Sequence, residues 1–269
     1  MSDVMKKGKR GLIMGVANDH SIAWGIAQAL HAHGAEMAFT YQGDVFKKRV
    51  EPLAESLGST ILIDCDVQKE SDLDGVFARI QKEWGGLDFV VHAIAYSNRE
   101  ELKGHYVDTT LDNFLQTMHI SCFSFTSVMR RAAALMKDGG AALTLTYHGA
   151  DKVMPNYNVM GVAKAALEAS VRYLAADLGP RGVRVNAISA GPMRTLAGSG
   201  IGSARMTFKY NTLTAPLRRN VELEELGGSA LYLLSGLSSA VTGEVHYVDC
   251  GFNVIGMPPH ENLKEIAGG

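Results

Sequence analysis

Residues 11–30 read GLIMGVANDHSIAWGIAQAL, and this stretch decides the fold class. Its first six residues form an apolar run that suits a buried strand, whereas Ile22, Ile26 and Leu30 recur at helical spacing. The helical stripe stops near Gly34, a residue type that often follows a helix end. Between the two patterns lies a turn that begins at Gly15. The stretch therefore predicts a strand, a glycine-containing turn and a helix in direct succession.

The same alternation continues along the chain. Further apolar runs predict strands at 36–41, 60–67, 87–93, 141–147, 183–188 and 244–248, and helical patterns occupy 70–84, 111–136, 158–178 and 222–234. Continuous apolar strands that alternate with helices indicate a parallel sheet covered on both faces, and right-handed crossovers make such a sheet doubly wound. We therefore expect an α/β protein with one Rossmann-type domain over residues 1–269, a seven-stranded parallel sheet and helices on both faces.

One segment departs from this regularity. Residues 196–212 are rich in Gly, Ser, Thr and Ala and have weak periodicity, which predicts a loop. An ordinary surface loop is one interpretation. A long loop beyond the carboxyl end of a strand also borders the ligand crevice in this kind of fold, so a substrate-binding lid over about 194–212 is the other.

Composition excludes several classes of function. The 26 basic and 28 acidic residues nearly cancel, so no charge excess points to nucleic acid, and no apolar run is long enough to span a membrane. The three cysteines are far apart and lack metal-ligand spacing, so we expect no metal site and no disulfide framework. These features predict a cytoplasmic protein.

The first turn suits the pyrophosphate of a dinucleotide. Gly15 permits a tight turn, Ser21 suits an N-cap, and Gly25 allows the helix to pack closely on the strand. A helix N-terminus supplies free N–H groups and a favourable dipole for an anion. The usual three-glycine spacing is missing, so a structural turn without a ligand stays open.

The end of the second strand bears on the choice of cofactor. An acidic residue there usually binds the adenine ribose, and an arginine usually accepts a 2′-phosphate, but this chain has Gln42. Gln42 favours NADH, while the basic run at 47–49 keeps NADPH open. After the third strand, Asp66 and Val67 fall where an adenine lies, although Asp66 could instead cap the next helix.

Two tyrosines and a lysine follow the fifth strand. Tyr147 ends the strand, and Tyr157 and Lys164 stand seven residues apart at the start of a helix, which places both side chains on one face. A phenol can donate a hydrogen bond or a proton to a developing oxyanion. An ammonium beside it can hold the nicotinamide ribose and favour the phenolate. The set predicts a reductase.

These residues carry a resemblance to a known family over nearly the whole chain. Most short-chain dehydrogenases/reductases place the lysine four residues after the tyrosine, but Gly161 stands there in this sequence. The Tyr-x6-Lys spacing, with Tyr147 in place of the usual catalytic serine, resembles the enoyl-acyl-carrier-protein reductases. Three further motifs resemble the same family, namely Gly15-x5-Ser21-Ile22-Ala23, PNYNVMG at 155–161 and VRVNAISAGP at 183–192.

The resemblance implies a role for each site residue. Tyr157 is expected to stabilise the enolate, Lys164 to bind the cofactor ribose, and Tyr147 to shape the site near the thioester. Ser97 falls where the family contacts substrate through its backbone, and Ala95 stands where better-known members have glycine. The residues implied to bind the cofactor are Gly15, Ser21, Ile22, Gln42, Asp66, Val67, Ile94, Lys164, Met193, Arg194, Thr195, Leu196 and Ala197.

The implied reaction is NADH-dependent reduction of the trans-2 double bond of an enoyl-acyl-carrier-protein substrate, the last step of each cycle of fatty-acid elongation. We also expect a homo-oligomer, specifically a tetramer, because two long helices carry small and apolar residues on more than one face. Two alternatives remain open: a carbonyl or 3-hydroxyacyl reductase of the same superfamily, and a non-catalytic NAD-binding protein.

Overall fold

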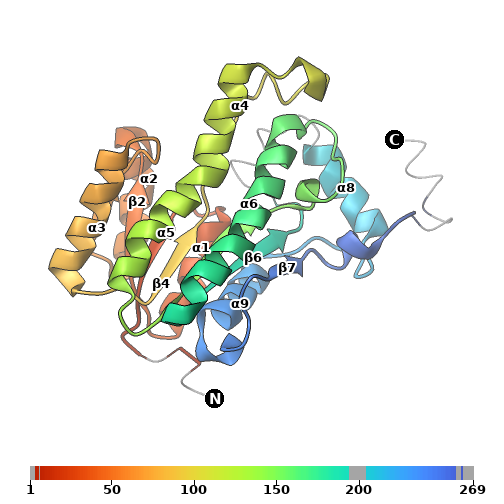
Figure 1. Ribbon diagram of the computed structural model, residues 1–269. Coiled ribbons are helices and arrows are strands. Elements are labelled where there is room, and N and C mark those ends of the chain that lie inside the picture. Colours follow the sequence, from red (N-terminus) through yellow and green to blue (C-terminus); the bar gives the residue numbers. More distant parts are fainter. Residues whose placement is uncertain (1–3, 6, 194–203, 259–261, 263–269) are drawn as a thin grey trace.

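The computed structural model describes residues 4–5, 7–193, 204–258 and 262. Its strands form a single sheet in the order β3-β2-β1-β4-β5-β6-β7, with every neighbouring pair parallel (Figure 1). The strands are β1 (Arg10–Met14), β2 (Glu36–Tyr41), β3 (Leu62–Asp64), β4 (Phe89–His92), β5 (Gly140–Thr146), β6 (Val183–Ala190) and β7 (Val245–Val248). The predicted seven-stranded parallel sheet is confirmed.

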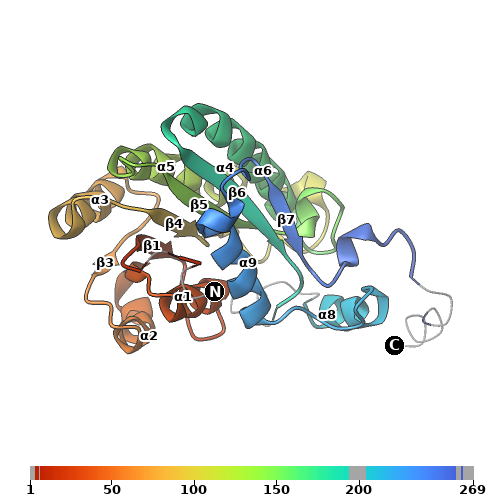
Figure 2. The ribbon, with the colours of Figure 1, turned by 90° about the horizontal axis from the view of Figure 1, so that it is seen from below.

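Helices cover both faces of this sheet. They are α1 (Ile22–Ala32), α2 (Gly43–Ser56), α3 (Glu70–Trp84), α4 (Leu111–Met118), α5 (Ser124–Leu135), α6 (Asn158–Leu178), α8 (Ala204–Thr214) and α9 (Leu223–Leu234). Short 3₁₀ turns lie at Tyr106–Asp108, His148–Ala150, Gly179–Arg181, Gly236–Ser238 and Phe252–Val254. Figure 2 shows α3, α5 and α6 on one side of the sheet and α1, α2 and α9 on the other.

The core follows from the alternation of side chains along each strand. In β1, Leu12 and Met14 pack with the core beneath α3, α5 and α6, whereas Ile13 packs with the core beneath α1 and α9. All three side chains are fully buried. A strand buried on both faces reads as a continuous apolar run, which is why the opening stretch of sequence identifies it.

The helix predicted over 111–136 is interrupted. A π-helical turn at His119–Phe123 separates α4 from α5. Within this turn the Ser121 hydroxyl accepts a hydrogen bond from the Tyr96 amide (2.9 Å) and donates one to the Tyr96 carbonyl (3.0 Å). The Ser124 hydroxyl donates to the Ile120 carbonyl at 2.6 Å. Tertiary and local side-chain bonds thus accompany a change of helical pitch that apolar spacing does not reveal.

The prediction of a loop over 196–212 is wrong from residue 204 onward, where α8 begins. Asn211 is buried, and its amide donates to the Arg219 carbonyl (3.3 Å) and to Asn220 Oδ1 (3.0 Å). Such bonds hold in place a helix whose own propensity is low. Residues 194–203 of the predicted lid lie outside the described residues.

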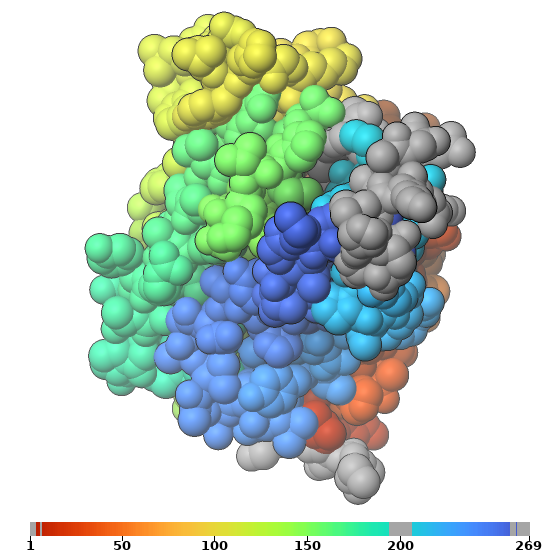
Figure 3. All heavy atoms as spheres, turned by 90° about the vertical axis from the view of Figure 1, so that its right-hand side faces the viewer, coloured from red at the N-terminus to blue at the C-terminus, as the bar shows by residue number. Residues whose placement is uncertain are grey.

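An aromatic contact ties α8 to the segment after β5. The Phe252 ring stands edge-on to both His148 (centroids 5.5 Å apart) and Tyr210 of α8 (6.1 Å). Figure 3 shows the dark-blue segment that contains residue 252 against the green segment that follows β5. Phe252 therefore links α8 to the segment that follows Tyr147.

Gly25 was predicted to let its helix pack closely on a strand, and this partner is wrong. A Cβ at Gly25 stands 2.9 Å from the Leu223 Cβ, and one at Gly227 stands 2.8 Å from the Ala29 Cβ, so both glycines lie where α1 crosses α9. Gly25 allows one helix to approach another helix, not a strand. The sequence shows that close packing is needed at this position, but the partner is nearly two hundred residues away.

Candidate active site

The site lies where the order of strands reverses. From β1 the chain proceeds to β2 and β3 on one side, and then returns to β4 on the other side of β1. In open parallel sheets this switch point, at the carboxyl ends of the strands, is where ligands bind. The described residues among those predicted from the sequence follow the ends of β1, β2, β3, β4, β5 and β6 along the chain.

The turn after β1 can be occupied only by glycine at its first position. Gly15 has φ +101°, and a Cβ built there lies 2.1 Å from the Ala93 carbonyl oxygen at the end of β4. Both features exclude a side chain. Gly15 therefore brings the turn and the end of β4 together at the switch point.

Ser21 precedes α1 as predicted, but it does not cap the helix with its side chain. Its hydroxyl accepts from the amides of Ala17 (3.0 Å) and Asn18 (3.1 Å) and so closes the turn instead. Ile22, the first residue of α1, packs against the core beneath that helix. The first-turn amides of α1 receive no side-chain cap and are suited to an anion.

The ends of β2 and β3 are accessible. Gln42 is exposed and precedes α2, and Lys47 lies 4.0 Å from Glu51 one turn further along the same helix. Asp66 Oδ1 accepts from the Gln68 amide (3.0 Å) in a turn before α3, but the N-cap of that helix is Lys69 and has no side-chain capping bond, so the capping interpretation of Asp66 is wrong. Val67 is buried in the core beneath α3.

The segment after β4 is anchored to α4. Ile94 packs on the core beneath α3, α5 and α6, and Ala95 is exposed. Ser97 is buried, and its hydroxyl donates to Asn113 Oδ1 (3.3 Å) and accepts from the Thr117 hydroxyl (2.9 Å). The Ser97 side chain is thus engaged by α4, so any contact with substrate falls to its backbone.

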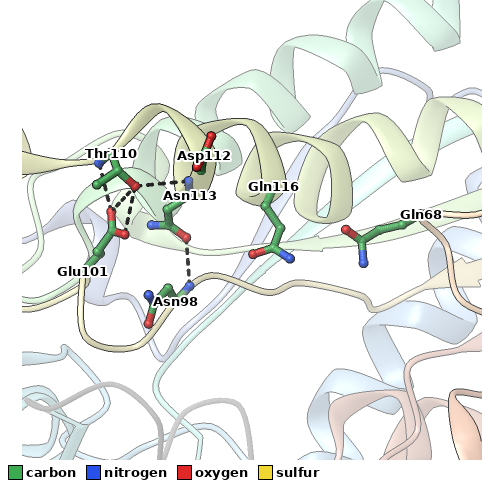
Figure 4. Close-up of a pocket in the computed structure, with 7 residues that line it drawn as sticks. All are labelled: Gln68, Asn98, Glu101, Thr110, Asp112, Asn113 and Gln116. Atoms are coloured by element: carbon green, nitrogen blue, oxygen red, sulfur yellow. Dashed lines mark hydrogen bonds between the residues drawn. The ribbon is translucent and has the colours of Figure 1, made fainter.

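A polar cavity of about 460 Å³ adjoins this anchor (Figure 4). Asn113 forms part of its wall and accepts a hydrogen bond from the Asn98 amide at 3.0 Å. The lining residues are Gln68, Asn98, Glu101, Thr110, Asp112, Asn113 and Gln116. A lining made up of polar residue types does not suit an acyl chain, and none of the predicted catalytic residues belongs to it. The cavity is therefore distinct from the catalytic centre.

The structure brings the two predicted tyrosines together. Tyr147 follows β5, and its ring meets that of Tyr157 edge-on, with centroids 5.1 Å apart and planes at 72°. Tyr157 immediately precedes α6 between Asn156 (φ 58°) and Asn158 (φ 37°). Asparagine tolerates such left-handed conformations better than most residues. This turn directs Tyr157 to a buried position at the end of β5.

The unusual spacing between tyrosine and lysine has a steric basis. A Cβ at Gly161 lies 2.7 Å from the Gly149 carbonyl oxygen, and one at Gly149 lies 2.4 Å from the Tyr157 ring. No side chain fits at position 161, so a lysine four residues after Tyr157 is excluded here. Lys164, three residues further along α6, takes the cationic position instead.

Lys164 is nearly fully buried, and its Nζ donates to the Leu145 carbonyl in β5 at 2.7 Å. Burial lowers the pKa of the Lys164 ammonium to about 8, and the smaller effects of Cys122 and Glu168 raise it. The Cys122 thiol itself has a raised pKa because it is buried. The Lys164 side chain is therefore positively charged below about pH 8 and loses its charge as the pH rises above that value.

Both tyrosines hold their protons strongly. Burial raises the pKa of Tyr147 to about 12 and raises that of Tyr157 further, with Tyr147 and Glu168 acting in the same direction on Tyr157. The expectation that the lysine shifts the phenol toward phenolate is not supported, because burial dominates. Tyr157 is a neutral hydrogen-bond donor in this site.

Two residues behind the lysine were not predicted. The Thr146 hydroxyl donates to Glu168 Oε1 at 2.6 Å, and Glu168 lies one helical turn after Lys164 on α6. The four-residue spacing from Lys164 was a signal available in the sequence. Thr146 carried no such signal, since its partner becomes known only when α6 is placed against β5.

The predicted cofactor contacts also include the segment that follows β6. Met193 packs on the core beneath α1 and α9. Arg194, Thr195, Leu196 and Ala197, predicted to close over the cofactor, lie outside the described residues. Within the described part of the chain, no group of His, Cys, Asp or Glu side chains could hold a metal ion, and no helix has the length and hydropathy to cross a membrane.

A glycine turn and an uncapped helix N-terminus at the switch point of a doubly wound parallel sheet define the class of dinucleotide-binding α/β proteins. Residues 15–253 match the family model described as enoyl-(acyl carrier protein) reductase. The chain therefore belongs to the enoyl-acyl-carrier-protein reductase family.

Known relatives agree with this assignment over nearly their whole lengths. The NADH enoyl-acyl-carrier-protein reductase 2 of Rhizobium meliloti (strain 1021) is 63% identical over 97% of each chain. The enoyl-acyl-carrier-protein reductase of Anaplasma phagocytophilum, solved in complex with NAD, has a TM-score of 0.92 and 57% identity over 96% of this chain and 98% of that one. FabI from Candidatus Liberibacter asiaticus has a TM-score of 0.94 and 57% identity, covering 96% and 100% of the two chains.

Proposed function

We propose that this chain is an NADH-dependent enoyl-acyl-carrier-protein reductase that saturates the trans-2 double bond of enoyl thioesters. The observation that carries the proposal is the edge-on contact between Tyr147 and the buried Tyr157, with the buried Lys164 two turns along the helix that Tyr157 precedes. Membership of the family supports the same activity. The substrate is an acyl chain held as a thioester on an acyl-carrier protein.

The residues at the switch point fit a dinucleotide. The turn closed by Ser21 leaves the first-turn amides of α1 for the pyrophosphate, with Gly15 and Ile22 on either side. The uncharged Gln42 side chain can form hydrogen bonds with the hydroxyls of the adenine ribose, and Lys164 holds the nicotinamide ribose. The remaining proposed contacts come from Asp66, Val67 and Ile94 and from residues 193–197.

Each catalytic group has one task. Reduced nicotinamide, when bound, supplies the hydride that is added to the β-carbon of the thioester. The neutral Tyr157 hydroxyl donates a hydrogen bond to the thioester oxygen, where negative charge develops. A proton derived from solvent is then added to the α-carbon. Tyr147 shapes the space beside that oxygen and shields it from water. Because the required group is an oriented donor, the raised pKa of Tyr157 suits the task.

Oxidation of NADH with crotonyl and longer enoyl thioesters tests the proposal, with 3-ketoacyl thioesters and NADPH as parallel assays. We expect turnover with enoyl thioesters and none with ketoacyl thioesters. Faster reduction of ketoacyl substrates would favour a carbonyl or 3-hydroxyacyl reductase. Binding of NADH without turnover of either substrate would favour a non-catalytic NAD-binding protein.

We propose that the protein acts in the cytoplasm as a homotetramer. Its three cysteines are free and buried, which suits a reducing compartment. Phe125 of α5 and Ala163 of α6 are buried within their own chain and give the tetramer no support. Phe123 and nearby apolar side chains do support it, because Leu111, Leu115, Phe123 and Tyr173 are 69%, 57%, 49% and 76% exposed. A monomer mass by light scattering at micromolar concentration would contradict it.

A further inference from the structure

Lys164 and Glu168 bind consecutive residues of the same strand. They are one turn apart on α6, so their side chains leave the helix on the same face. Lys164 Nζ donates to the Leu145 carbonyl at 2.7 Å, and Glu168 Oε1 accepts from the Thr146 hydroxyl at 2.6 Å. The next residue is Tyr147. Two adjacent bonds therefore attach α6 to the end of β5 immediately before the first active-site tyrosine.

The charged groups around Lys164 come from several elements. Cys122 faces it from the π-helical turn, Glu168 from α6 and His92 from β4. Burial raises the pKa of the Cys122 thiol, which keeps it neutral near physiological pH, and burial lowers the pKa of His92 to about 3, which keeps that imidazole neutral as well. Glu168 is thus the neighbouring group that supplies negative charge to the buried ammonium.

Glu168 has its own surroundings. Burial raises the pKa of its carboxyl, whereas the hydrogen bond from Thr146 and the positive charges of Arg172 and Lys164 favour the carboxylate. The other groups that interact with it electrostatically are Asp151, Tyr157 and Tyr247. Since Arg172 and Lys164 lie on the same helix as Glu168, the carboxylate has cations on both sides.

One negative charge at this position has two useful effects. It favours the ammonium form of Lys164 and disfavours the phenolate form of Tyr157. The proposed reaction requires both groups to be protonated, because the lysine holds ribose hydroxyls and the tyrosine donates to an oxyanion. Because burial by itself keeps Tyr157 protonated, removing the charge affects mainly the ammonium of Lys164.

We propose that Glu168 is a positioning residue that keeps Lys164 protonated and fixes the end of β5 through Thr146. This proposal rests on the proposed function for its reaction, but its effect on Lys164 also extends to cofactor binding alone. No catalytic step is assigned to Glu168 itself.

The test measures the dissociation constant of NADH between pH 6 and about 10 by fluorescence titration, in wild type and in Glu168→Gln. In wild type, affinity falls as the pH rises through about 8, because the ammonium is lost there. We expect the glutamine variant to lose affinity at a pH lower by roughly one unit, the size of effect an opposite charge has at close range. Asp177→Asn, which removes an exposed acidic side chain from the same helix, should leave the profile unchanged.

Measurements of turnover distinguish the effect of the Glu168 charge from the effect of its hydrogen bond to Thr146. Thr146→Val keeps the carboxylate but removes its hydrogen bond, so we expect lower kcat with little change in the pH profile of NADH binding. A Glu168→Gln protein that folds with wild-type Tm and has the wild-type pH profile overturns the proposal. If the glutamine variant does not fold, Glu168→Asp replaces it, and wild-type kcat in this shortened variant overturns the positioning role.

The two proposals fail separately. Wild type that binds NADH but reduces no enoyl thioester contradicts the proposed function and leaves the titration as a valid test of Glu168. Wild type whose NADH affinity does not change up to pH 10 or so contradicts the role given to Lys164 and, with it, the role of Glu168.

Discussion

Gly161 of α6 lies against the carbonyl oxygen of Gly149, with only 2.7 Å available between that oxygen and a Cβ at position 161. We predict that Gly161→Ala destabilises the protein by about 1–3 kcal/mol, because backbone atoms must move to admit the methyl group. Gly75→Ala is the matched control: Gly75 lies within α3 with no atom near its Cβ position, and alanine should stabilise that helix. Thermal unfolding measures both, and an equal Tm for Gly161→Ala and wild type would contradict the prediction.

Tyr157→Phe should lower turnover of enoyl thioesters by about 10²–10³ while leaving NADH affinity nearly unchanged. The change removes the hydroxyl donor but keeps the ring that packs against Tyr147. Single-turnover kinetics on a full-length acyl-carrier-protein substrate measure the effect. Tyr173→Phe, at an exposed position of α6, provides the control. Unchanged turnover would remove Tyr157 from the mechanism.

Lys164→Ala should act mainly on the cofactor. Loss of charged hydrogen bonds worth about 1.5–3 kcal/mol corresponds to roughly 10–150-fold weaker NADH binding. The sign of the pH dependence follows from the lowered pKa: the ammonium is present below about pH 8 and lost above it, so wild-type affinity declines on the alkaline side. Isothermal titration with Lys82→Ala, an exposed site on α3, as control checks the effect. Wild-type affinity in the alanine variant would contradict the assignment.

NADH should have a higher specificity constant than NADPH. Gln42 gives a 2′-phosphate no positive charge, and Lys47 lies beside Glu51 on α2. Replacing Lys47, Lys48 and Arg49 one at a time by alanine should leave the specificity constant for NADH unchanged. A preference for NADPH that disappears in one of these variants would identify a basic side chain that reaches the phosphate.

The amides of α8 should become better protected from hydrogen exchange when NADH and a substrate analogue are both bound. Met206 of this helix is 66% exposed, and apolar surface of this kind is suited to covering an acyl chain. The contact of Tyr210 with Phe252 joins α8 to the segment that follows β7. Amides of α3 serve as the internal reference. Equal protection of α8 in the free and bound states would rule out a lid.

How far the sequence determines these features depends on the range of the interactions. The turn at Gly15 and the pair of Tyr157 and Lys164 were predictable because each signal lies within one strand, turn or helix. Helix α2 was not predicted, since Pro52 lies inside it and only Val50 and Ala54 of its side chains are fully buried. The bond from Thr146 to Glu168 and the tertiary bonds of α8 depend on contacts between distant segments, which periodicity does not encode.

The crossing of α1 and α9 at Gly25 and Gly227 also bears on how the protein is made. A ribosome completes residue 25 long before residue 223 emerges, and at about 5–20 residues per second the interval is roughly 10–40 s. During that interval the cofactor-binding end of the chain has its strand and turn but not the helix that covers α1. Nascent chains arrested before residue 223 should therefore bind chaperones. Once the full chain is released, α9 can pack against α1.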